Sequence, residues 1–289
     1  NSTGASNTAV GSGTLTSNTT ASYNTGMGAE CMVAMTTGHS NVAIGWGAMT
    51  SASTAQLAVG IGYKALYSNT TSQCNTAVGY TSQRLTTTGT MNTSTGFDAL
   101  GANTTGNRST SFGAQSGSVN TTGDNNIFIG YDAGVSGSPG GNITTADNEI
   151  CLGDENISAA NIQVDWTIAS DKRDKTDVSP MDLGLEFINK LEPVTYRWDK
   201  RSKYSDDQSA TPDGTHKEEQ LEGGFLAQDV EAIEEQYGHK LSDNTNLTFH
   251  LSEDEKMYGI KYGKFVPMLV KAVQELSAEV EELKAKLEE

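Results

Sequence analysis

A glycine recurs every 17 residues through the first half of the chain, and this period strongly restricts the possible folds. The residue before each of these glycines is apolar in every case except one, where it is Thr95. A disordered, low-complexity segment does not need such a register, whereas a stack of similar coils does. The glycines of this series are Gly11, Gly28, Gly45, Gly62, Gly79, Gly96, Gly113 and Gly130.

Other positions follow the same 17-residue period. Asparagine often stands four residues before the glycine, as at Asn41 and Asn75, and an aromatic residue often follows it, as at Trp46 and Tyr63. The intervening segments are short and favour β structure, and each coil has only one or two large apolar residues. Because so few apolar side chains cannot bury a core alone, we predict a trimeric shaft over residues 1–135. Its fold is mainly β, a β-roll or solenoid in which three chains share their apolar edges.

The repeat resembles the head repeats of trimeric autotransporter adhesins, which have a similar order of asparagine, apolar residue, glycine and small residue. Asn41, Ile44, Gly45 and Ala48 show this order here. The resemblance covers about residues 7–135 and implies a trimer, although the repeats of that family have a shorter period. The recurring aromatic residues permit two interpretations, stacking on sugars or filling the trimer interior. We favour the interior because large apolar residues are scarce in this half.

Several Asn-x-Ser/Thr sequences occur, and these could be acceptors for N-linked glycans. Four of them are the Asn-Thr-Thr element of the repeat and follow its period, so the repeat explains them better than glycosylation does. The asparagines concerned are Asn18, Asn69, Asn103, Asn120, Asn142 and Asn156.

The composition changes near Asp165, which indicates two regions of different character. The chain has 12 charged residues up to this point and 43 in the 124 residues that follow. After Gly130 the sequence predicts a loop and then a last partial coil at residues 148–153. Ile162, Val164 and Trp166 alternate as in a strand. We therefore assign residues 136–169 to the end of the shaft and its junction with a second domain, residues 170–289.

The second domain has the mixed pattern of an α+β fold. Residues 182–190 predict a short helix, 193–198 a strand, and 225–237 the end of a strand followed by a helix. The polar stretch 202–222 between them predicts a loop. The domain ends in a long helix at residues 264–289.

That last helix has apolar residues in a heptad pattern with Glu and Lys on its flanks, which predicts a coiled coil rather than a helix packed only on its own domain. Valine at the first core position and leucine at the second favour a dimer when taken alone. We nevertheless predict a homotrimer, because the shaft requires three chains. The predicted coiled-coil core consists of Val266, Leu269, Val273, Leu276, Val280, Leu283 and Leu287.

Four sequence pieces, in this order, resemble the intramolecular chaperone domain of phage tailspikes and tail fibres, the peptidase S74 family. They are Ser-Asp-Lys-Arg-Asp-Lys at 170–175, Leu-Glu-Pro-Val-Thr-Tyr-Arg-Trp at 191–198, Gly-Phe-Leu-Ala-Gln-Asp-Val-Glu at 224–231, and Tyr-Gly-Lys-Phe-Val-Pro at 262–267 with the helix that follows. The resemblance covers about residues 168–289. It implies a domain that drives folding and then cuts the chain once.

Carried onto this sequence, the resemblance implies that Ser170 is the nucleophile, Lys175 the general base and Asp171 the accompanying acidic residue. The cut would fall between Ala169 and Ser170. A serine hydroxyl is a weak nucleophile that needs a base nearby, and lysine serves once it has lost its proton. We expect a single self-cleavage and no turnover on external substrates.

The bulk properties exclude several other functions. The formal net charge of −17 makes the chain a poor partner for nucleic acid, which requires Lys and Arg to neutralise phosphates. No apolar run reaches the length of a transmembrane helix, so we expect no membrane insertion. Cys31, Cys74 and Cys151 form no zinc or disulfide motif. We expect no metal and no cofactor.

We therefore expect the distal fragment of a viral tail fibre or tailspike, folded in the host cytoplasm and located in the virion. Its expected partners are two further copies of the chain, upstream fibre or tail proteins, and a host-surface receptor, for which we expect a glycan. The alternative is a bacterial trimeric surface adhesin with a non-catalytic coiled-coil cap. A glycan-cleaving enzyme is a weaker hypothesis, because Asp147 and Glu149 alone are poor support for a glycosidase site.

Overall fold

The computed structural model of the protein describes residues 2–205 and 207–288. The chain divides into two compact units, which are described separately here. The first unit comprises Asn1–Ile157 together with the inserted loops Lys200–Pro212 and Ser252–Met257. The second comprises Ser158–Asp199, Asp213–Leu251 and Tyr258–Glu289.

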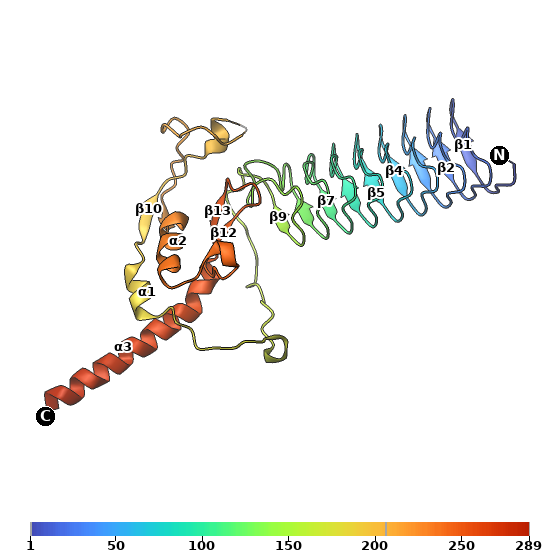
Figure 1. Ribbon diagram of the computed structural model, residues 1–289. Coiled ribbons are helices and arrows are strands. Elements are labelled where there is room, and N and C mark those ends of the chain that lie inside the picture. Colours follow the sequence, from blue (N-terminus) through green and yellow to red (C-terminus); the bar gives the residue numbers. More distant parts are fainter. Residues whose placement is uncertain (1, 206, 289) are drawn as a thin grey trace. The chain divides into compact units, whose positions relative to one another are not determined.

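The first unit is a parallel β-solenoid, which confirms the predicted shaft fold. Nine three-residue strands pair in parallel and in sequence order, one strand per coil (Figure 1). Neighbouring strands up to β8 are 17 residues apart in register, whereas Ile127 of β8 pairs with Ile150 of β9 across a longer loop. The strands are β1 (Thr8–Val10), β2 (Thr25–Met27), β3 (Val42–Ile44), β4 (Val59–Ile61), β5 (Thr76–Val78), β6 (Thr93–Thr95), β7 (Thr110–Phe112), β8 (Ile127–Ile129) and β9 (Ile150–Leu152).

The recurring glycine directly follows each of the first eight strands, and its backbone conformation explains why no other residue stands there. The φ angles of the eight glycines lie between +114° and +142°, a region that residues with a β-carbon rarely adopt. For the first seven, a β-carbon would also collide with the backbone of the glycine one coil further on. The 17-residue period is therefore set by a column of glycines in direct backbone contact.

The solenoid interior is narrow and is filled by small residues and a polar ladder. The middle residue of β3, β5 and β8 is buried, and these residues are Ala43, Ala77 and Phe128. The side-chain nitrogen Nδ2 of buried Asn41 donates to the side-chain oxygen of Asn24 at 2.9 Å and to the backbone carbonyl of Ala55 at 2.8 Å. Recurring asparagines thus hold successive coils together from inside.

Four of the possible glycan acceptors lie inside this solenoid. The side chains of Asn18, Asn69, Asn103 and Asn120 are buried. Asn103 donates to the carbonyl of Gly106 and accepts from its backbone N–H, at 3.1 and 3.0 Å. These asparagines therefore shape the corners of the coils, and a glycan on any of them would be incompatible with the folded shaft.

The aromatic residues after the glycines form a stacked column on the outside of the solenoid. Ring centroids of Trp46, Tyr63, Tyr80 and Phe97 are successively 5.1, 4.7 and 5.5 Å apart. The rings of Tyr63 and Tyr80 are covered on both faces by their neighbours, so they present mainly edges to the surroundings. Sugar stacking on these two ring faces is therefore disfavoured in this arrangement, and the predicted burial of the column in a trimer remains a prediction.

The second unit is α+β. Helix α1 (Leu185–Lys190) precedes strand β10 (Val194–Tyr196), which pairs with β11 (Glu222–Gly224), and helix α2 (Ala227–Gln236) follows. A hairpin of β12 (Phe249–Leu251) and β13 (Tyr258–Ile260) leads to the long helix α3 (Phe265–Glu288). The short 3-10 turns of this unit are η1 (Lys172–Asp174), η3 (Leu241–Asp243) and η4 (Tyr262–Lys264), whereas η2 (Arg201–Lys203) belongs to an inserted loop of the first unit. The apolar core consists mainly of Leu183, Phe187, Val230, Phe265 and Met268.

Two local predictions differ from the structure. The strand expected around Ile162, Val164 and Trp166 does not form, and residues 161–170 are exposed without regular structure. Alternating apolar residues require a neighbouring strand before they form a ladder, and this segment of the single chain has none. The hairpin of β12 and β13 was not expected, since its sequence has no short turn signal. Over the described residues, no helix has both the length and the apolar character to cross a membrane.

Candidate active site

The segment that starts at Ser170 folds into one short turn, and this turn is positioned by Asp171. The Asp171 carboxylate accepts a 2.9 Å hydrogen bond from the backbone N–H of Arg173 and thereby caps η1. It also accepts from the guanidinium of Arg173, whose Nη2 lies 2.6 Å away. The Arg173 side chain and then its backbone N–H hold the pKa of the Asp171 carboxyl below its ordinary value. Asp171 is therefore a charged cap at neutral pH.

The turn brings the two predicted reactive residues together. Lys175 Nζ donates a hydrogen bond to Ser170 Oγ over 2.6 Å, although five residues separate them in sequence. The three residues of η1 reverse the chain between them. The structure thus pairs Ser170 with Lys175, and pairs Asp171 with Arg173.

The pair is exposed in the single chain, as are Ala169 and the other residues from 161 to 180. In the observed bond the lysine donates and the serine hydroxyl accepts. To act as a base, the amine must be neutral and accept the serine proton. A neighbour that covers this turn would exclude water from the pair and so favour the reactive arrangement.

These features define a protein that joins a parallel β-solenoid shaft to an α+β domain with a Ser–Lys pair near its N-terminal end. Residues 170–239 match the protein family described as peptidase S74, chaperone of endosialidase. The matched region begins at Ser170 itself. The match supports a role in folding and trimerisation of a fibre-like shaft and suggests autoproteolysis. No curated protein and no solved structure matches the chain.

Three of the four sequence pieces noted above lie within the matched residues, and the piece that starts at Tyr262 lies beyond them. This last piece forms η4 and the start of α3. One face of α3 packs on its own domain through Phe265, Met268 and Ala272, which are buried. The predicted coiled-coil residues lie outside that face, and their exposure ranges from 40% at Val280 to 87% at Leu287.

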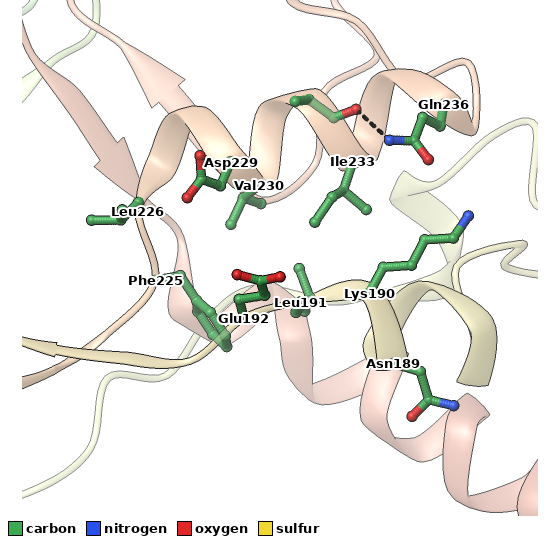
Figure 2. A pocket seen from close by; sticks show the side chains of 11 residues that line it. Asn189, Lys190, Leu191, Glu192, Phe225, Leu226, Asp229, Val230, Ile233 and Gln236 are labelled. Atoms are coloured by element: carbon green, nitrogen blue, oxygen red, sulfur yellow. Dashed lines mark hydrogen bonds between the residues drawn. The ribbon is translucent and has the colours of Figure 1, made fainter.

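A groove of about 630 Å³ lies between the end of α1 and helix α2 (Figure 2). Leu191, Phe225, Val230 and Ile233 form its apolar part, while Lys190, Glu192 and Asp229 bring charge to its sides. Neither Ser170 nor Lys175 lines it. The groove is therefore separate from the candidate reactive pair.

The structure shows two acidic residues with structural roles that the sequence did not predict. Glu234 of α2 is buried and accepts hydrogen bonds from the backbone N–H groups of Leu247 and Thr248, at 3.1 and 3.0 Å. Glu253, at the tip of the β12–β13 hairpin, accepts several hydrogen bonds from the last coil of the solenoid. Both lie in strongly acidic stretches where no spacing distinguishes them from solvated residues.

Proposed function

We propose that the C-terminal domain is a self-cleaving folding and trimerisation domain of a viral tail fibre or tailspike, and that it cuts the chain between Ala169 and Ser170. The observation that carries this proposal is the 2.6 Å hydrogen bond between Lys175 Nζ and Ser170 Oγ, at the first residue of the matched region. The solenoid before it is the kind of shaft that such a domain serves.

The position of the serine determines the chemistry of the cut. Ser170 Oγ belongs to the residue that follows the scissile bond, so its attack on the Ala169 carbonyl closes a five-membered ring. The neutral amine of Lys175 takes the hydroxyl proton. The C–N bond then breaks, the Ser170 nitrogen leaves as a free amine that takes up a proton, and an ester joins Ala169 to Ser170 Oγ. Water hydrolyses this ester to the Ala169 carboxylate and the restored serine.

Assembly would control this step. The pair is exposed to solvent in the single chain, whereas a reactive Ser–Lys pair is favoured in a site from which water is excluded. The exposed apolar row of α3 is suited to bring three chains together and cover such a site. Cleavage would then follow assembly, and each domain would cut its chain only once.

A removable folding domain suits this type of shaft. Parallel coils pair residues 17 apart, and a homotrimer must in addition align three similar repeats that slip easily in register. A coiled coil forms from local contacts and fixes the alignment of the chains early. After the cut, the shaft would unfold slowly but lack the element that guided its folding, and its stability would be kinetic. We propose that the mature shaft contributes to host attachment in the virion.

Intact mass of freshly expressed protein tests the proposal, with wild type beside Ser170→Ala, Lys175→Arg and Lys172→Arg. Wild type and Lys172→Arg should give two fragments that divide after Ala169, whereas Ser170→Ala and Lys175→Arg should remain whole. Arginine keeps the positive charge but does not lose its proton, so Lys175→Arg separates basicity from charge. An uncut wild-type chain would remove the self-cleavage assignment and favour an adhesin with a non-catalytic coiled-coil cap.

A further inference from the structure

Each coil near the C-terminal end of the shaft has a corner formed by a threonine, here called the threonine corner. The threonine donates two hydrogen bonds to the backbone carbonyl of the corresponding threonine on the next coil. The backbone N–H and hydroxyl of Thr104 donate to the Thr121 carbonyl at 2.8 and 3.0 Å. One coil further, the N–H and hydroxyl of Thr121 donate to the Thr144 carbonyl, again at 2.8 and 3.0 Å. Each corner thus has donors that require an acceptor on the next coil.

At Thr144 the acceptor is a side chain instead of the next coil. The backbone N–H of Thr144 donates to Glu253 Oε2 at 2.8 Å, and its hydroxyl donates to Oε1 at 3.0 Å. These distances equal those of the preceding corners. The carboxylate of Glu253 therefore stands where the carbonyl of a further coil would stand.

Further donors converge on the same carboxylate. The N–H of Thr145 lies 3.0 Å from Oε1, the N–H of Ala146 lies 3.2 Å from Oε2, and the Thr145 hydroxyl also donates. Three consecutive backbone N–H groups and two hydroxyls thus face one carboxylate. Such a concave row of N–H groups is a well-suited anion site, and a carboxylate offers two oxygens where a carbonyl offers one.

The loops around Glu253 add contacts to the same end of the shaft. Asp254 Oδ2 accepts from the N–H of Asn142 at 3.4 Å, and Lys200 Nζ donates to the Glu155 carbonyl at 2.6 Å. Arg201 of the other inserted loop donates to the carbonyl of Lys256, which joins the two loops. Both loops belong to the compact unit of the shaft, although they follow the cleavage site in sequence.

We propose that the last coil of the shaft is a carboxylate-binding site with Glu253 as its occupant, and that this contact holds the shaft and the C-terminal fragment together after the chain is cut. The cut itself rests on the proposed function. Its product would be a non-covalent complex, in which breaking the peptide bond and releasing the fragment are separate events. Release would then require the Glu253 contact to open.

The experiment uses the full chain, which is cut by an added protease and not by its own Ser–Lys pair. A recognition sequence for a site-specific protease is placed between Ala169 and Ser170 in a Ser170→Ala background, and the folded protein is cut by that protease. The two fragments should co-elute in size-exclusion chromatography. Glu253→Gln should raise the dissociation constant of the complex about tenfold or more, because it replaces one acceptor oxygen by an amide facing donors.

Glu255→Gln is the matched control, since it makes the same change two residues away at an exposed side chain and should leave the dissociation constant unaltered. Amide exchange at Thr144 and Thr145 in the uncut chain provides a second measurement, and Glu253→Gln should accelerate it. Separation of the parent fragments, or equal behaviour of the two variants in both measurements, would overturn the proposal. Because the protease makes the cut, a wild-type chain that does not cleave itself would affect the proposed function only.

Discussion

A β-carbon on Gly45 would lie 2.6 Å from the carbonyl oxygen of Gly62, one coil further along the shaft. Gly45 also has a φ of +123°, where side chains are strained. We therefore expect Gly45→Ala to destabilise the shaft by roughly 3 kcal/mol or more, from the backbone strain and the displacement of a neighbouring coil. Chemical denaturation followed by circular dichroism measures this change.

Gly60→Ala is the matched control for that variant. Gly60 occupies the middle of β4, where the neighbouring coils have Ala43 and Ala77. A β-carbon there would lie 3.0 Å from Met49 Cγ and 3.3 Å from the carbonyl oxygen of Ala65, a less severe approach than at Gly45, and Gly60 does not have a positive φ. The control should change the unfolding free energy much less than Gly45→Ala, and an equal loss in both variants would contradict the glycine-column explanation.

A second prediction concerns the buried Glu234. Its carboxylate is fully buried and accepts from the backbone N–H groups of Leu247 and Thr248. Glu234→Leu should leave both N–H groups without this acceptor and destabilise the C-terminal domain by about 2–4 kcal/mol. Glu235→Leu, at the exposed neighbouring position, should lower the free energy of unfolding of this domain much less. Thermal unfolding of the two variants compares them, and similar melting temperatures would show that the buried hydrogen bonds contribute little.

The period of the shaft was visible in the sequence because it has a local physical cause. A glycine column cannot drift by a residue without collision, so Gly45 and Gly62 keep their spacing and reveal the coil length. The Ser170–Lys175 pair was predicted from the family resemblance, and the two residues can meet because they belong to one turn of six residues. Patterns of this kind depend on neighbours in sequence.

Other features depend on partners that sequence spacing does not identify. The sequence showed that asparagine recurs with the period, but not that Asn41 would be buried and bonded to Ala55 inside the coil. Glu253 contacts Thr144 across 109 residues, and its acidic surroundings resemble any solvated loop. The alternation at Ile162 and Val164 predicted a strand, but a strand also requires a partner.

A third prediction tests self-association through α3. Leu276 is a predicted core residue of the coiled coil and is 48% exposed in the single chain. Leu276→Lys should therefore leave the fold of each chain intact but bury a charge in the assembled coiled coil, which disfavours assembly. Ala278→Lys introduces the same side chain on another side of the helix and is the control. Sedimentation velocity should report trimers for the control and smaller species for Leu276→Lys, and unchanged trimers in both would locate the interface elsewhere.

The last prediction concerns pH and the Glu253 contact. Burial raises the pKa of the Glu253 carboxyl, but hydrogen bonds from Thr145, Thr144 and Ala146 outweigh this effect and lower it to about 2, from an ordinary value of 4.5. A carboxyl whose pKa is lower in the bound state stabilises that state above its ordinary pKa and loses this contribution as the pH falls towards the lowered value. The contact should therefore be at full strength above about pH 5 and weaken between pH 4.5 and 2.

The protease-cut protein described above allows a direct measurement, because the fraction of co-eluting fragments can be followed from pH 7 to pH 3. Asp254 and the Glu155–Lys203 pair also lie at this end of the shaft, so Glu253 is not the only acidic contact there. Glu253→Gln retains those groups and should show a flatter pH dependence than the parent. If parent and variant lose co-elution in parallel as the pH falls, the acid sensitivity belongs to the neighbouring groups and not to Glu253.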